Sequence, residues 1–164
     1  MEPLRRLAPA SYCTAALLLL LPMMDYLGNA WPFRPSAADW RYDVLGMIST
    51  HLLPPLLGLL LAIVTAAALP HPRVSRILGV LVWLGAVVLL LALGGFVLDS
   101  LQVRNAAPAD ARWVTKTSFL LASAKILAAA VALMVLGVGN RRAAQAVVPT
   151  VVTRSAPAAI IGQR

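Results

Sequence analysis

The sequence predicts an all-α protein of the polytopic membrane class, a bundle of four helices that each cross a bilayer. Apolar residues make up 60% of the 164 residues and charged residues 12%, whereas a typical soluble domain is ~25% charged. The apolar residues gather in four stretches, each as long as a transmembrane helix requires, ~20 residues. These stretches are residues 7–28, 44–69, 77–98 and 117–138. With their connections they form one predicted membrane domain, residues 1–139, and we expect no separate soluble catalytic domain.

The first stretch has two interpretations. Arg5 and Arg6 precede the apolar run, and Gly28 and Ala30 form a small-x-small site, as in a cleaved signal peptide. However, residues 22–25 separate the apolar core from that site, and the stretch is long enough to span. A retained helix is therefore our prediction, and cleavage stays as the alternative.

The second and third stretches form a hairpin. Pro54 and Pro55 lie inside the second stretch, and their missing N–H groups predict a bend there. The short segment 70–73 is a tight turn, so the third stretch runs antiparallel to the second. Small residues in the spans predict close helix packing. They are Gly58, Ala62, Gly85, Ala128 and Ala132.

Basic residues favour an orientation with both termini in the cytoplasm. In that orientation the inner segments hold eight Lys and Arg residues and the outer loops five. The net charge of +8 then reflects membrane topology, with the bilayer as partner, and does not predict nucleic-acid binding. The tail, residues 140–164, has no apolar periodicity and is predicted to be basic, cytoplasmic, and flexible or ordered by a partner.

The two longer outer loops carry aromatic and basic residues at the predicted membrane–water boundary, where tryptophan rings are favoured. The residues expected at this outer interface are Trp31, Arg34, Trp40, Arg41 and Trp113.

Ionisable side chains in or beside the spans are the candidate functional residues, because such groups are costly in a bilayer. They form a hypothetical intramembrane polar patch of Lys125, His51, Asp25 and Asp99. Lys125 lies deepest, ~15 Å below the outer end of its helix at 1.5 Å per residue. Helical phase places Lys125 and His51 on faces rich in small residues, so we expect both to face protein.

Two interpretations of this patch remain open. It could be a proton or ion relay, or a site for a polar headgroup or substrate. Alternatively, Lys125 forms a buried pair with an aspartate and fixes the register of the helices.

No catalytic or cofactor site is predicted. The single cysteine, Cys13, excludes an internal disulfide and a cysteine-rich metal site. His51 and His71 are 20 residues apart, ~30 Å along a helix, so they cannot ligate one haem iron. A haem held by His51 with methionine or water is the remaining alternative. We therefore expect no enzyme activity, no metal and no cofactor.

The segments WPFRP (31–35), WR (40–41) and PPLLG (54–58) resemble uncharacterised small bacterial four-helix integral membrane proteins. The resemblance covers roughly the first outer loop and the second span and implies no activity. The composition, rich in Ala, Leu and Arg, is typical of the bacterial inner membrane.

The function predicted from these observations is a non-catalytic accessory or structural subunit. It would pack against another membrane protein or against another copy of itself. The alternative is a small transporter or channel-like protein that uses the polar patch, and a membrane-embedded enzyme ranks third.

Overall fold

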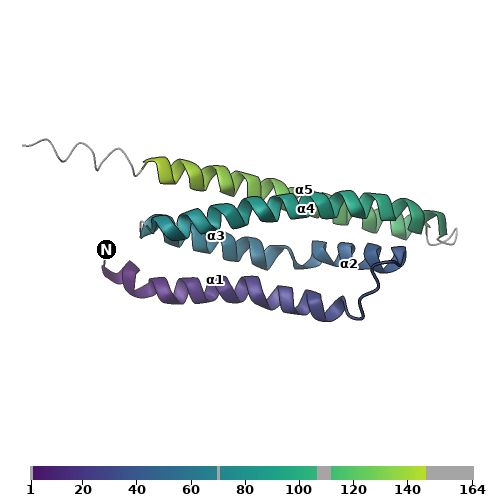
Figure 1. The fold of residues 1–164 in the computed structure, drawn as a ribbon, viewed down its shortest axis with the longest axis horizontal. Coiled ribbons are helices and arrows are strands. Elements are labelled where there is room, and N and C mark those ends of the chain that lie inside the picture. Colours follow the sequence, from purple (N-terminus) through teal and green to yellow (C-terminus); the bar gives the residue numbers. More distant parts are fainter. Residues whose placement is uncertain (1, 70, 107–111, 147–164) are drawn as a thin grey trace, which may run out of the picture.

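The structure is a computed structural model that describes residues 2–69, 71–106 and 112–146. These residues form five α-helices that lie along one long axis (Figure 1). In chain order the helices are α1 (Glu2–Asn29), α2 (Ala38–His51), α3 (Leu53–Ala68), α4 (Pro72–Ala106) and α5 (Arg112–Ala146). The described ranges contain no strand, which confirms the predicted all-helical architecture.

Three helices are individually long and apolar enough to cross a membrane: Arg6–Asn29, Pro72–Val103 and Arg112–Ala143. The second predicted span is divided instead. Its two parts, α2 and α3, meet the same criterion only as a pair and are bent by 46° at their junction. The described residues therefore contain three continuous candidate spans, and a fourth if the bent pair is one span.

The junction between α2 and α3 follows from the proline pair. Pro54 and Pro55 have no N–H to donate to the carbonyls of Thr50 and His51, so the helical hydrogen-bond ladder is interrupted there. Leu52 lies between the two helices, and the prolines fall in the first turn of α3, where a missing N–H costs little. The predicted bend is thus confirmed.

The helices form two closely packed pairs. α4 packs chiefly against α5, and α1 chiefly against α3, while α2 and α3 bridge the two pairs (Figure 1). Gly58 of α3 is buried, and a Cβ at this position would lie 2.8 Å from the Ala15 carbonyl oxygen of α1. The absence of a side chain at Gly58 is therefore what lets α1 and α3 approach this closely.

The core consists of small and branched apolar side chains contributed by four helices. Its buried members are Ala15, Leu59, Ala62, Ile63, Ala66, Leu78, Val82, Ala86, Leu89, Ile126, Ala129, Ala130 and Leu133.

The predicted packing residues divide into two groups. Gly58 and Ala62 are buried, and Gly85 lies beside Leu133 of α5. Ala128 and Ala132 are both exposed on α5. The buried face of α5 thus lies about 100° away, one residue along the helix, from the face on which we placed these alanines.

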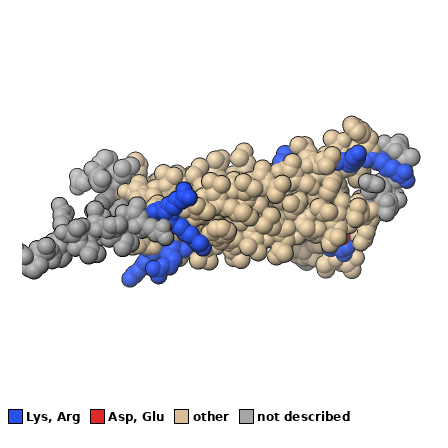
Figure 2. All heavy atoms as spheres, turned by 90° about the horizontal axis from the view of Figure 1, so that it is seen from above, with Lys and Arg blue, Asp and Glu red and all other residues tan. Residues whose placement is uncertain are grey.

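The long side of the molecule is apolar. Figure 2 shows Lys and Arg gathered mainly toward the two ends, with a broad belt of other residues between them. Large side chains in this belt are exposed, among them Leu20, Leu91 and Val135. Such a surface is suited to lipid rather than water.

The last helix is longer than expected. α5 continues to Ala146, so residues 140–146 of the predicted tail are helical. The rest of the predicted tail, 147–164, lies outside the described residues.

Candidate functional site

The break between α2 and α3 places His51, the last residue of α2, beside α1. Its Nε2 lies 2.8 Å from Oδ2 of Asp25. On the other side of the ring, Nδ1 lies 3.0 Å from the Met47 carbonyl oxygen and 2.9 Å from the Thr50 hydroxyl. Tyr26 presents an edge-to-face contact to the same ring. The structure thus joins two residues of the predicted patch, Asp25 and His51.

The hydrogen-bond partners of His51 indicate how the pair carries charge. A carbonyl oxygen and a carboxylate both accept, and they face opposite nitrogens of one ring. Both contacts are hydrogen bonds at once when the ring holds two protons and Asp25 holds none. In that state the two charges compensate each other, and the contact forms without leaving a net charge between α1 and α2.

Asp99 does not join this pair. It is buried on α4, with a side chain 8% exposed, and it binds Arg41 of α2. The Arg41 Nη2 donates to Oδ1 at 2.7 Å and Nε to Oδ2 at 3.0 Å, while Nη1 donates to the Pro35 carbonyl at 2.8 Å. A two-pronged guanidinium–carboxylate contact fixes orientation as well as distance. It therefore clamps α2 and the loop before it to α4.

Lys125 stands apart from both contacts. It is exposed on α5, and within the described residues no hydrogen bond or ion pair reaches its ammonium group. Lys125 therefore does not face the interior of this chain's own bundle, contrary to our expectation of a buried contact within the chain. Because α5 presents alanines on both its buried and its exposed faces, their small size does not indicate which face is packed.

Lys125 is nevertheless at the same level of the bundle as the His51 contact. Leu45 lies beside Gly95 of α4, and Phe119 packs against the next residue, Phe96. His51 and Lys125 each follow six residues later, ~9 Å further along their helices. The patch predicted from the sequence is thus divided into a His–Asp contact, a separate Arg–Asp contact and an unpaired lysine.

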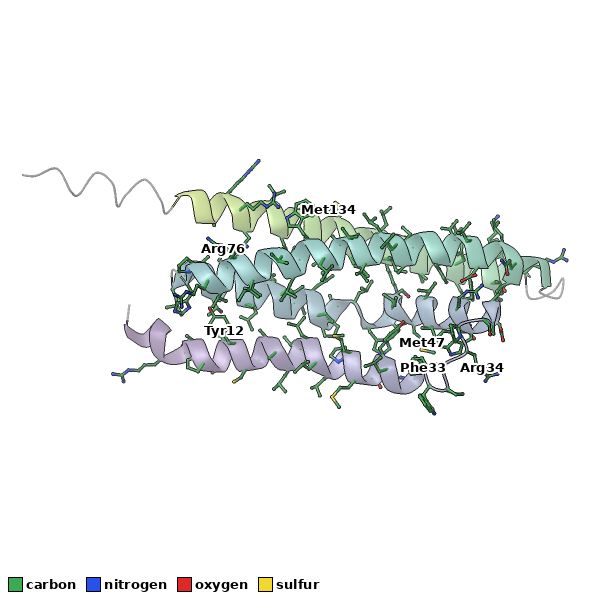
Figure 3. The ribbon with its side chains drawn as sticks, viewed as in Figure 1. Tyr12, Phe33, Arg34, Met47, Arg76 and Met134 are labelled. Carbon is green, nitrogen blue, oxygen red and sulfur yellow. The ribbon has the colours of Figure 1, made fainter. Side chains whose placement is uncertain are left out.

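The end of the bundle that holds Trp31, Trp40 and Trp113 is called the Trp40 end. Trp40 donates its Nε1–H to the Ala30 carbonyl at 3.1 Å and packs edge-to-face on Phe33. Trp31 and Trp113 are exposed. Phe33 and Arg34 extend outward from the connection between α1 and α2 (Figure 3). Of the five predicted interface residues, Trp31, Arg34 and Trp113 are therefore exposed, whereas Trp40 and Arg41 are partly buried.

The opposite end, called the His71 end, has polar contacts that sequence reasoning missed. Asn140 of α5 is buried, donates to the Ser75 carbonyl at 2.8 Å and accepts from the Ser75 hydroxyl at 2.7 Å. Tyr12 points from α1 toward the turn between α3 and α4 (Figure 3), where its hydroxyl lies 3.1 Å from His71 Nδ1. One available signal was that Asn140 is the first strongly polar residue after the last apolar stretch.

The described parts of the chain contain no preformed set of metal ligands. Across residues 2–69, 71–106 and 112–146, no three His, Cys, Asp or Glu side chains are grouped so that they could hold a metal ion.

No protein-family model, curated protein or solved structure matches this chain.

Proposed function

We propose that this chain is a four-span integral membrane protein of the bacterial inner membrane and serves as a non-catalytic accessory subunit. In this proposal the bent pair α2–α3 is the second span, both termini face the cytoplasm, and the exposed face of α5 packs against another membrane helix.

Lys125 is the observation that carries the proposal. It lies ~20 Å from the start of α5 at Arg112 and ~24 Å from Arg141, near the middle of the helix. An unpaired lysine exposed to hydrocarbon at the centre of a span costs ~2.5–3.5 kcal/mol on insertion scales. A packed partner helix that offers an acceptor would remove this cost.

The other polar contacts support a packing role. Arg41–Asp99, His51–Asp25 and the Ser75–Asn140 pair each bind a side chain on one helix to another helix. Contacts of this kind fix helix register and leave these groups already engaged with protein.

Photo-crosslinking in membranes tests this proposal. A crosslinking amino acid at Ala128, on the Lys125 side of α5, is compared with the same amino acid at the exposed Val87 of α4. We expect a protein adduct from position 128 that weakens in a Lys125→Met background, and mainly lipid adducts from position 87. Lipid adducts alone from position 128 would remove the basis for a subunit role.

The orientation has its own test. In a Cys13→Ala background, single cysteines are placed at Ser36 and His71, both exposed and in connections at opposite ends of the bundle. We expect a membrane-impermeant maleimide to label position 36 in intact cells and position 71 only after permeabilisation. The reverse pattern would place the termini outside.

A small transporter or channel-like protein is the second candidate, because the His51–Asp25 contact lies at the break in the α2–α3 pair. Interrupted helices provide ion sites in many transporters. Proton flux into sealed vesicles that is lost in Asp25→Asn and retained in Asp39→Asn, an exposed acid at the start of α2, would favour this candidate.

A further inference from the structure

We infer that the α5 face around Lys125 binds a second copy of this chain, at the α1 face around Asp25. This inference rests on the proposed subunit function and deepens it by naming the partner and the contact. Lys125 of one copy would meet the carboxylate of Asp25 in the next.

The first support is that the two groups lie at one level of the bundle. His51 and Lys125 each lie ~9 Å beyond the adjacent α4 residues Gly95 and Phe96, as counted from Leu45 and Phe119. Asp25 is bonded to His51, so it shares that level to within about the reach of one side chain. Two copies that are side by side in one membrane, with the same orientation, therefore bring these opposite charges to matching depths.

The second support is that both groups are accessible to a neighbour but not to each other. The Asp25 side chain is 64% exposed although it bonds to His51. Lys125 is exposed on α5, and the two residues form no ion pair within the copy. α1 packs chiefly on α3, whereas α5 packs chiefly on α4, so the two residues are carried by different helix pairs.

The hydrogen-bonding capacity of Asp25 leaves room for the lysine. A carboxylate offers about four lone-pair positions. In this copy Oδ2 is bonded to His51 at 2.8 Å, and Oδ1 accepts from Asn29 at a longer 3.3 Å. An ammonium from a neighbouring copy would add a charge-assisted bond on the exposed side of the carboxylate.

The surfaces around both groups permit a close approach of two helices. Beside Lys125, the exposed surface of α5 carries only short side chains at three positions, Ala124, Ala128 and Ala132. Beside Asp25, a Cβ built on Gly28 would meet no atom within 4 Å. Small residues of this kind allow membrane helices to pack closely enough for interhelical hydrogen bonds.

The contact joins two different faces, so it is heterologous. Every copy carries one Lys125 face and one Asp25 face, and repetition of the contact closes a ring or extends a row. A consequence is that two chains, each defective in a different half of the contact, can still form one contact with each other.

Complementation between variants tests this consequence. Two chains with different epitope tags are co-expressed, and each carries the photo-crosslinking amino acid at Ala128. We expect the parent chain to crosslink to a second copy of itself, giving a self-adduct. Lys125→Met alone or Asp25→Asn alone should reduce the yield of this self-adduct about tenfold or more. Co-expression of the two variants should restore an adduct between the two tags.

Matched controls replace charges outside the contact. Lys116→Met on α5 and Asp39→Asn on α2, both exposed residues, should leave the self-adduct unchanged. The double exchange Lys125→Asp with Asp25→Lys should restore part of it. Restoration by co-expression also shows that both variants fold, because a misfolded chain would not complement.

Four results would overturn the inference. The first is a self-adduct that both single variants retain in full. The second is a pair of single variants that each lose the self-adduct and fail to form a mixed one. The third is an adduct at position 128 to a different protein only, which would leave the proposed subunit function standing. Adducts to lipid alone would overturn both proposals.

Discussion

Replacement of Gly58 by alanine tests whether the close approach of α1 to α3 holds this half of the bundle together. A Cβ at Gly58 would lie 2.8 Å from the Ala15 carbonyl oxygen and 3.1 Å from Leu18 Cβ. Ordinary contacts begin near 3.4 Å, so α1 would have to retreat by about 0.6 Å, the difference between 3.4 and 2.8 Å. The obstacle at Ala15 is backbone, which cannot rotate away as a side chain can.

The size of the effect follows from a comparison with Gly94→Ala on α4. A Cβ at Gly94 would meet nothing within 4 Å. Both substitutions share the helix-propensity gain of alanine over glycine, ~1 kcal/mol, so this term cancels in their difference. Overpacking costs ~1–3 kcal/mol. We therefore expect Gly58→Ala to lower the free energy of unfolding by about 1–3 kcal/mol relative to Gly94→Ala.

The assay is reversible unfolding in mixed micelles, with helix content followed during titration with sodium dodecyl sulfate. Equal unfolding free energies for the two variants would refute the argument, because they would show that α1 adjusts to the extra methyl group without loss of packing.

Three further tests of the polar and packing contacts use the same assay. Arg41→Met should lower the free energy of unfolding more than Asp99→Asn, because it leaves a buried carboxylate without its cation. The opposite order would show that the Arg41–Asp99 contact contributes little to stability. Asn140→Ala removes two hydrogen bonds at the His71 end and should cost about 0.6–1.7 kcal/mol, and no measurable change would contradict a structural role. The Gly137→Ala protein should be less stable than the Gly139→Ala protein. A Cβ at position 137 would lie 2.8 Å from Nε1 of Trp83, whereas a Cβ at position 139 would meet no atom within 4 Å. Equal stabilities of the two variants would contradict this packing.

The spans were predictable from the sequence because hydrocarbon imposes a simple requirement on length and apolarity. The proline pair at residues 54–55 likewise predicted the bend, because each missing N–H removes one hydrogen bond of the helix at a known position. What the hydropathy did not reveal was that the bend would end one helix at His51 and begin another at Leu53.

The candidate site was predictable only in part, because its contacts join residues far apart in sequence. Arg41 and Asp99 are separated by 58 positions, and each alone looks like an ordinary residue of a membrane interface. The face of Lys125 was assigned from neighbouring alanines. Because Ala129 is buried and Ala128 exposed, residue size gave no information about helical phase on α5.

The clamp between Arg41 and Asp99 has a consequence for how the protein is made. A chain emerges from the ribosome N-terminal end first, so Arg41 reaches the membrane well before the residue that binds it. The partner of His51, by contrast, precedes it by 26 positions and is already present. The end of α2 can thus meet α1 through His51 and Asp25 during synthesis, while Arg41 near the start of α2 still has no Asp99 to bind. The contact that binds the start of α2 to α4 can form only after the end of α4 has been made.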